Sequence, residues 1–339
     1  MTQLVRLDPE RPDRDLIESA ASIIRNGGLV AFPTETVYGL GADAMSEAAV
    51  RRIFEAKGRP ADNPLIIHVC STQMLETTAR RLTEKTKRLS ERFWPGPLTL
   101  VLDRNPGIPA AVSSGLDTVA VRMPNCRIAL DLIRAAGTPV AAPSANASGR
   151  PSPTSAAHVF GDLDGRIEMI LDGGMTNIGI ESTVLDVTTD PPLILRPGWI
   201  TREQLLESIG QTEIAASEEE LKRSPGTRHR HYSPRVPVIL IEHTAPQSLR
   251  QILQEHLRKG KVGFIGHSPA GLGDSGLRAI NLRDDAEDYA HSIYAAFREL
   301  EDWGAEVVVV LGIDDKGEGA AVMDRLRRAA SEIIRDAAR

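Results

Sequence analysis

Residues 26–41 have the sequence NGGLVAFPTETVYGLG, and this stretch sets the organisation of the first half of the chain. Before it, apolar positions between Leu16 and Arg25 recur with the period of a helix, which Asn26-Gly27-Gly28 ends. Leu29 to Phe32 then form a short apolar run that is typical of a buried strand, and Pro33 ends that strand. A helix, a turn and a buried strand in succession predict an α/β fold.

Further apolar runs predict more strands, and segments with helical spacing lie between several of them. These runs cover 65–69, 98–102, 119–122, 140–142, 169–171, 182–186 and 193–196. We therefore predict a mixed α/β domain over residues 1–210. Over residues 211–236 the periodicity fails, because a charge run is followed by a segment rich in Pro, Gly and basic residues. This composition predicts a linker.

Beyond the linker, residues 237–339 again alternate strand-like and helix-like segments. The predicted strands are 238–241, 261–265, 277–282 and 307–311. Three helices are predicted: one ends near residue 257, one covers 286–303, and one closes the chain. Such alternation predicts a small, Rossmann-like domain with a mainly parallel sheet. Two domains also suit 339 residues, since one hydrophobic core rarely grows to that size.

The composition is that of a globular chain. Hydrophobic residues make up 41% and charged residues 25%, which is enough apolar surface for packed cores. A formal net charge of -6 gives no overall attraction to nucleic acid or anionic membranes. Cys70 and Cys126 have the spacing of neither a disulfide framework nor a zinc site. Without a signal-like N-terminus or an apolar stretch of roughly 18 residues, we predict a cytoplasmic protein with no membrane partner.

The segment PTETVYGLG places several hydrogen-bonding side chains on a bend after a strand, and its two glycines permit close backbone approach. A simple strand-to-helix turn with capping hydroxyls would use the same residue types. A dinucleotide-binding turn is not favoured, because Pro33-Thr34-Glu35-Thr36 follows the strand at the point where such a turn needs its glycines. The P-loop pattern GxxxxGK[ST] is also missing, so nucleotide binding must rest on other groups.

Lys57-Gly58-Arg59 is a cluster of positive charge that can face one polyanion. The lysine would act as a mobile point charge and the arginine as a planar fork, which suits phosphate. A solvated basic turn is the alternative. His68 lies within the apolar run 65–69, where it is either a core histidine with satisfied hydrogen bonds or a residue of a site.

Arg122 ends an apolar strand, where an unpaired charge is costly, so we expect it to have an anionic partner. Either a ligand carboxylate or an internal Asp or Glu would serve. The loop 143–149 and Ser152 are dense in small donors that suit phosphate or ribose, although ordinary linkers share this composition. The chain has no Ser-His-Asp order, paired carboxylates or metal cage. This inventory favours positioning and electrostatic stabilisation of nucleotidyl transfer over covalent catalysis.

These motifs, in this order, resemble those of the YrdC superfamily. The resemblance rests on PTETVYGLG (33–41), KGRPADNPLIIH (57–68), PGPLTLVL (95–102), VAVRMP (119–124), APSANASGRPSPT (142–154), ESTVLD (181–186) and LRPG (195–198). The linker SPGTRHRHYSP and the appended α/β segment resemble the long, two-domain form of the threonylcarbamoyl-AMP synthases in this superfamily. The resemblance implies a twisted mixed sheet with a concave, positively charged active-site cavity in the first domain.

The resemblance also implies an activity and its residues. Such enzymes are nucleotidyltransferases that make L-threonylcarbamoyl-AMP from L-threonine, bicarbonate or CO2 and ATP, with release of pyrophosphate. The implied threonine contacts are Thr36, His68, Arg122, the backbone of Ala142, and Ser182. The implied ATP contacts are Lys57, Arg59, Asn63, Thr118, Ser144, Ser152, Arg196 and Tyr232, of which Lys57 and Arg59 are the implied catalytic residues. The resemblance implies no protein ligand to a metal.

Mg²⁺ is expected together with ATP. The product would pass to a tRNA threonylcarbamoyl transferase for modification at position 37 of ANN-decoding tRNAs, and direct tRNA binding is left open. A second hypothesis is an RNA-binding or ribosome-associated module, but no aromatic stacking platform accompanies the basic residues. A third is carbamoyl transfer as in hydrogenase maturation, but the acylphosphatase and zinc-finger segments of those proteins are missing from this chain.

The linker has the composition of a flexible segment, yet it holds several basic residues and an aromatic one, Arg228 to Tyr232. We predict that it closes over bound ATP or the labile product as a lid. A passive tether is the alternative. The second domain carries no catalytic cluster that the sequence reveals, so a structural or regulatory role is expected for it.

Overall fold

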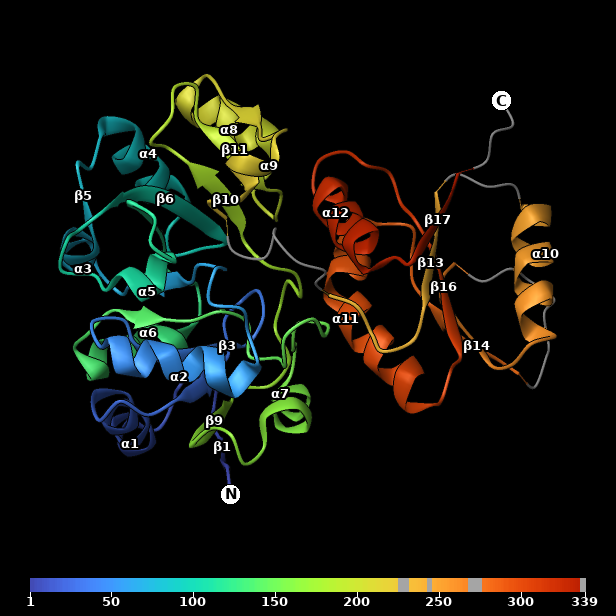
Figure 1. Cartoon of the computed structure of the whole chain (residues 1–339), viewed down its shortest axis with the longest axis horizontal. Helices are drawn as coiled ribbons and strands as arrows, with labels where there is room; N and C mark the ends of the chain where they lie inside the picture. The colour runs from blue at the N-terminus through green and yellow to red at the C-terminus, as the bar shows by residue number, and fades with distance from the viewer. Residues whose placement is uncertain (225–231, 243–245, 268–275, 336–339) are drawn as a thin grey trace. The chain divides into compact units, whose positions relative to one another are not determined.

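The opening helix and strand form close to where the sequence predicts them, in a computed structural model of the chain (Figure 1). The helix α1 spans Arg14–Arg25, and the side chain of Asp13 caps its first turn by accepting hydrogen bonds from two backbone N–H groups. The strand β2 spans Val30–Phe32 and is buried along its whole length. The structure describes residues 1–224, 232–242, 246–267 and 276–335.

The chain forms two compact units, residues 1–148 with 152–229, and residues 149–151 with 230–339. The first unit therefore continues past the predicted boundary at residue 210. It gains β12 (Glu213–Ile214), which pairs with β11 (Leu193–Arg196), and α9 (Glu218–Leu221). These elements are too short to show a periodic pattern in the sequence, and for this reason the predicted linker included them. The lid prediction falls largely on residues 225–231, which lie outside the described residues.

A mixed sheet organises the first unit, as predicted. Within the described residues its order is β1-β9-β2-β3-β8-β4-β7-β6-β10-β11-β12, with β5 paired to β6. The other strands are β1 (Gln3–Arg6), β3 (Gly39–Asp43), β4 (Ile66–His68), β5 (Ala79–Arg80), β6 (Leu98–Arg104), β7 (Thr118–Arg122), β8 (Val140–Ala141), β9 (Met169–Asp172) and β10 (Thr183–Asp186). The other helices are α2 (Glu47–Lys57), α3 (Thr72–Thr78), α4 (Glu84–Phe93), α5 (Ala110–Ser113), α6 (Arg127–Ala136), α7 (Ala156–Leu163) and α8 (Arg202–Ile209).

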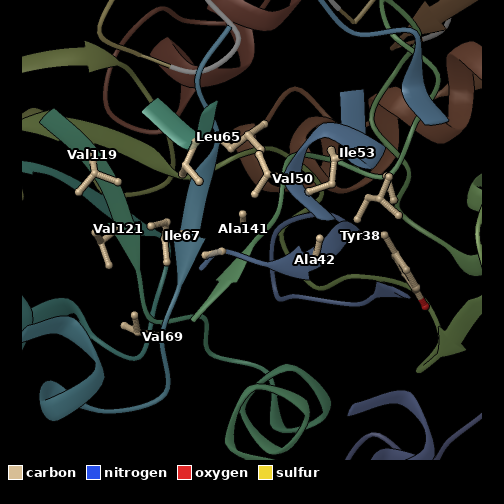
Figure 2. Close-up of a cluster of buried hydrophobic side chains, with 14 of the residues drawn as sticks. Tyr38, Ala42, Val50, Ile53, Leu65, Ile67, Val69, Val119, Val121 and Ala141 are labelled. Carbon is tan, nitrogen blue, oxygen red and sulfur yellow. The ribbon is translucent and has the colours of Figure 1, made fainter. Parts of the chain in front are cut away.

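Alternation along the strands divides the apolar side chains between the two faces of this sheet. On one face, Ala31, Ile67 and Val121 belong to a large core that includes residues of α2 and α7, part of which Figure 2 shows. On the other face, Val30 and Phe32 belong to a second core with α1 and α6. The sheet is thus covered by helices on both faces, although the second core does not reach β7.

The segment Gly39–Asp43 forms β3 itself and pairs antiparallel with β2. This pairing explains why the glycines do not form a dinucleotide-binding turn. A Cβ atom at Gly41 would lie 2.7 Å from the ring of Phe32 and 2.8 Å from Val140. The close packing of neighbouring strands therefore requires glycine at position 41.

The second unit contains a parallel sheet, as predicted, whose order in the described residues is β15-β14-β16-β13-β17. Its strands are β13 (Val238–Glu242), β14 (Val262–Gly266), β15 (Leu277–Asn281), β16 (Val307–Leu311) and β17 (Glu332–Arg335). Its helices are α10 (Pro246–Leu257), α11 (Ala286–Asp302) and α12 (Gly319–Ala329), with α10 on one face of the sheet and α11 and α12 on the other (Figure 1). The strand β17 follows the predicted closing helix and was not foreseen.

Residues 149–151 pack within the second unit. Arg150 forms an ion pair of 3.0 Å with Glu301, and Arg298 donates a 2.5 Å hydrogen bond to the carbonyl of Pro151. The predicted domain boundary places these residues in the first domain. A tripeptide that belongs to the core of another part of the chain cannot be recognised from local pattern.

Candidate active site

Three polar residues of the predicted site share one face of the sheet of the first unit. In the parallel pair β4 and β7, His68 lies opposite Arg122, so their side chains are neighbours. Ile67 and Val121, the residues just before them on these strands, point to the opposite face of the sheet and belong to the large apolar core there. On β6 and at the start of β10, Thr99 Oγ1 and Ser182 Oγ are 2.7 Å apart. Strand alternation therefore brings His68, Arg122 and Ser182 to one side of the sheet.

The guanidinium of Arg122 is buried and has an internal partner. Its Nη2 lies 2.5 Å from Oε2 of Glu35, and the two side chains are 4% and 6% exposed. Its Nη1 donates a 2.9 Å hydrogen bond to Thr36 Oγ1, and its Nε donates to the carbonyl of Gly96 at 3.2 Å. Of the two partners that the sequence leaves open for Arg122, this structure contains the internal carboxylate.

The turn PTET is held by its own hydroxyl groups and by a distant loop. Thr34 Oγ1 donates to the carbonyl of Val37 at 2.7 Å and accepts from the backbone N–H groups of Thr36 and Val37. The backbone carbonyls of Glu35 and Thr36 accept hydrogen bonds of 2.8 and 3.0 Å from Ile178 and Gly179. Thr34 is thus a local turn residue, while Glu35 and Thr36 present their side chains to Arg122.

His68 is neutral in this environment. Burial, together with the nearby charge of Arg122, lowers the pKa of His68 to about 3. Its ring lies edge-on to Phe32 at 6.1 Å between centroids, and within the described residues Nδ1 has no hydrogen-bond partner. A neutral imidazole with an available nitrogen can bond a hydroxyl group, but it is a weak base.

Arg196 holds the start of β10. Its Nε and Nη2 donate to the carbonyl of Ser182 at 3.1 and 3.0 Å, and Nη2 also reaches Ser182 Oγ at 3.2 Å. Both side chains are buried. The structure therefore joins one predicted ATP contact, Arg196, to one predicted threonine contact, Ser182.

Gly198 leaves no room for a side chain beside this pair, because a Cβ atom there would lie 2.2 Å from the backbone nitrogen of Thr183 and 2.5 Å from the carbonyl carbon of Ser182. We expect Gly198→Ala to destabilise the protein by about 1–3 kcal/mol, since backbone atoms must move to admit the methyl group. Thermal unfolding should show a lower Tm. Gly161→Ala in α7, where no atom lies within 4 Å of the added Cβ, is the control and should not lower it.

Lys57 is buried and contacts the loop of residues 143–149, which we call the serine-rich loop. As the last residue of α2, it donates from Nζ to the carbonyl of Ser144 at 2.5 Å and to the carbonyl of Asn146. Its own carbonyl accepts a 2.9 Å hydrogen bond from the backbone of Ser148. The prediction of a mobile point charge is wrong for this structure, because the burial of an ammonium group requires fixed acceptors.

The remaining predicted ATP residues come from the segment after α2, from the loop 143–149 and the residues after it, and from the start of β7. Arg59 donates to the carbonyls of Asn63 at 3.3 Å and Pro64 at 3.0 Å. Ser144 Oγ donates to the side chain of Asn146 at 2.6 Å. Ser152 Oγ donates to Glu181 Oε1 at 2.5 Å. Thr118 begins β7. The predicted threonine contact Ala142 follows β8, and its backbone N–H donates a 2.8 Å hydrogen bond to the carbonyl of Ile66.

Tyr232 is described within the second unit. Its ring stacks on Tyr294 with 5.7 Å between centroids, and the guanidinium carbon of Arg325 lies 5.4 Å from its centroid. Its backbone has a positive φ of 68°, which is uncommon for a residue with a side chain. The role of Tyr232 toward ATP stays a prediction.

The sequence did not single out some residues that the structure adds to the site. Glu35 pairs with Arg122, Asn146 accepts from Lys57, Glu181 accepts from Ser152, and Thr99 bonds Ser182. Glu35 and Glu181 are acidic residues in otherwise apolar or hydroxyl-rich segments, and this contrast is the signal that could have identified them. Within the described residues, no group of three or more His, Cys, Asp or Glu could hold a metal ion.

The fold and the site define a two-unit α/β protein whose first unit gathers buried cations, hydroxyls and carboxylates on the loops and strand ends of a mixed sheet. The chain belongs to the Sua5/YciO/YrdC family: the model described as "Telomere recombination" matches residues 22–198. The model described as "Threonylcarbamoyl-AMP synthase, C-terminal domain" matches residues 200–331. This family assignment confirms the resemblance that the motifs indicate.

Relatives align over almost the whole chain. The threonylcarbamoyl-AMP synthase of Pyrococcus abyssi is 47% identical over 95% of this chain and 96% of its own length. That of Bacillus subtilis is 44% identical over 93% of this chain and 92% of its own length. The crystal structure of P. abyssi Sua5 complexed with L-threonine matches with a TM-score of 0.92 and covers 99% of this chain and 100% of that chain.

Proposed function

We propose that this chain is a threonylcarbamoyl-AMP synthase, which makes L-threonylcarbamoyl-AMP from L-threonine, bicarbonate or CO2 and ATP and releases pyrophosphate. The observation that carries the proposal is the full-length similarity, at 47% identity, to a threonylcarbamoyl-AMP synthase whose family has a solved structure with L-threonine. The site supports it, because Arg122, Thr36, His68 and Ser182 offer charge and hydrogen bonds suited to a small hydroxylated amino acid.

In this proposal the threonine amine takes up CO2 or bicarbonate to form a carbamate, and a carbamate oxygen then attacks the α-phosphorus of ATP. Pyrophosphate leaves. Arg59 and Arg196 provide guanidinium groups for the charge that develops on the phosphates, and Lys57 fixes the loop that carries Ser144 and Asn146. No covalent enzyme intermediate is needed, so catalysis rests on positioning and electrostatics.

We propose that Mg²⁺ enters with the ATP, since Mg²⁺ is usually bound through substrate phosphates and waters and needs few protein ligands. The product would be passed to a tRNA threonylcarbamoyl transferase. A cytoplasmic location also stays a prediction; no helix within the described residues has both the length and the apolar character that crossing a bilayer requires.

The test of the proposed function is pyrophosphate release with ATP and bicarbonate, in the presence of threonine, of serine or of no amino acid. Release that depends on threonine and is several-fold weaker with serine is the expected result. Detection of threonylcarbamoyl-AMP by mass spectrometry would identify the product. Release at the same rate without an amino acid would contradict the proposal.

Arg59→Ala and Ser182→Ala should both lose threonine-dependent pyrophosphate release. Each change removes a group that is expected to bond a substrate, and a hydrogen bond to a charged group contributes roughly 1.5–3 kcal/mol, or about 10- to 150-fold in rate. Steady-state assays at saturating ATP and threonine measure the effect. Arg88→Ala, which removes an exposed arginine on α4, is the matched control. Wild-type rates in both site variants would contradict the assignment of the site.

A further inference from the structure

A buried carboxylate lies beside the residues that are expected to hold threonine. The side chain of Glu35 is 6% exposed, and its Oε2 is 2.5 Å from Arg122 Nη2. Within the described residues, the two carboxylate oxygens of Glu35 have no hydrogen-bond partner of good geometry, and the same is true of Nη2 of Arg122. A carboxylate has sites for about four hydrogen bonds, and buried polar groups are normally bonded, so this pair has unused bonding capacity.

The charges of this pair match those of an amino acid zwitterion. Arg122 can bind an α-carboxylate and Glu35 can bind an α-ammonium group, so a bound amino acid would replace one poorly bonded ion pair with two bonded ones. Thr36 Oγ1, which accepts from Arg122 Nη1 at 2.9 Å, belongs to the same turn as Glu35. The turn is fixed at its backbone by Ile178 and Gly179, so both side chains are presented together.

We propose that Glu35 accepts the proton that the threonine ammonium group must lose before it can react. This inference rests on the proposed function. An N–H bond of the ammonium breaks, its electron pair stays on nitrogen, and the proton forms an O–H bond with Glu35. The lone pair then forms the N–C bond of the carbamate. Formation from bicarbonate releases one water, and formation from CO2 releases one further proton to solvent.

Burial favours this transfer. When Arg122 pairs with the substrate carboxylate, Glu35 and the ammonium group are two charges in a site from which water is largely excluded. Moving one proton between them makes both groups neutral and removes the cost of burying the charges. Glu35 regains its negative charge when the proton passes to solvent on product release, and it can then pair with Arg122 again.

The other titratable groups around Glu35 are poorly suited to this role. Burial and the charge of Arg122 lower the pKa of His68 to about 3, so its imidazole has little affinity for a proton. The thiol of Cys126 is also close, and burial raises its pKa, which keeps it protonated and unable to accept. Arg122 is a cation. Glu35 is therefore the carboxylate of this cluster that the geometry places beside Arg122, where the ammonium group of the amino acid is expected.

Glu35→Gln tests the proposal, because glutamine keeps the shape and a hydrogen-bond acceptor but cannot act as a base. We expect kcat for threonine-dependent pyrophosphate release to fall about 100- to 1,000-fold at pH 7.5, the usual range for loss of a general base. The Kd for threonine from calorimetry should rise as well, because glutamine cannot form an ion pair with the ammonium group, so kcat is compared at saturating threonine. The rate of the variant should rise about tenfold per pH unit between pH 7 and 9, as more threonine carries a free amine, whereas the wild-type rate changes little.

Two further measurements separate a base from a merely structural residue. Glu35→Asp, which keeps a carboxylate, should recover part of the lost kcat. Formation of ATP from pyrophosphate and threonylcarbamoyl-AMP made by the wild-type enzyme needs no amine deprotonation, so Glu35→Gln should retain it. Equal loss of both reactions, or a pH profile parallel to that of the wild type, would overturn the proposal. So would full activity of Glu35→Gln beside an active wild type; an inactive wild type would instead overturn the proposed function.

Discussion

Arg122→Met is expected to lower the free energy of unfolding of the first unit by about 3–5 kcal/mol, because it leaves the buried carboxylate of Glu35 without its cation. The change also removes the hydrogen bonds that Arg122 donates to Thr36 and to the carbonyl of Gly96. Urea unfolding, monitored through the hydrogen exchange of backbone amides in β4 and β7, would measure this loss of stability beside the substituted residue. Binding of threonine should also become undetectable by calorimetry.

The double variant Glu35→Gln/Arg122→Met is the control for this prediction. Replacing both partners of a buried ion pair is often nearly neutral, whereas removing one partner is costly. The double variant should therefore regain much of the stability that the single variant loses, although it should stay inactive. If the single and the double variant unfold at the same urea concentration, the pair does not contribute in the way its burial indicates.

Lys57→Met is expected to lower kcat/KM for ATP by about 100-fold, because the loop loses the two charge-assisted hydrogen bonds that hold it, and a misplacement of about 1 Å is enough for a loss of this size. The carbonyls of Ser144 and Asn146 would then be left without their shared donor. The loop should lose its position, so the KM for ATP should rise while the Kd for threonine stays close to that of the wild type.

Lys87→Met on α4 is the matched control, since Lys87 is exposed and its replacement should leave the KM for ATP unchanged. Melting curves of both variants would show whether Lys57→Met still folds. A Lys57→Met protein that folds and has the wild-type KM for ATP would contradict the proposal that this lysine positions the loop. An equal loss of affinity for ATP and for threonine would instead indicate a general disruption of the sheet.

The predicted strands and helices agree well with the structure wherever a buried run or a helical period is long enough to be distinctive. Leu98–Arg104, Val307–Leu311 and Ala286–Asp302 are examples. Short elements such as β5 and β12 escaped prediction, because two residues carry no period. The strand β3 escaped because its glycines suggest a turn, although they are there to allow close packing against Phe32.

The candidate site was only partly predictable. Arg122 could be identified as a charge that needs an anion, but the identity of that anion depended on which loop lies beside the end of β7. Lys57 was expected to be mobile, yet it is fixed by carbonyls that lie 87 and 89 residues further along the chain. Sequence separation of this size leaves no local pattern, because the partner is a backbone carbonyl that every residue possesses.

By itself, the amino-acid sequence determined the α/β class, the two-part organisation, most strand and helix positions, and the ordered motifs that place the chain in its family. These follow from hydrophobic period, capping and turn residues, which act over a few neighbouring positions. The tertiary structure alone decided that Glu35 meets Arg122, that Arg196 meets Ser182, and that Lys57 lies under the serine-rich loop. Ion pairs and hydrogen bonds between distant segments depend on how strands are ordered and registered in the sheet, and that order is set by the packing of the whole unit.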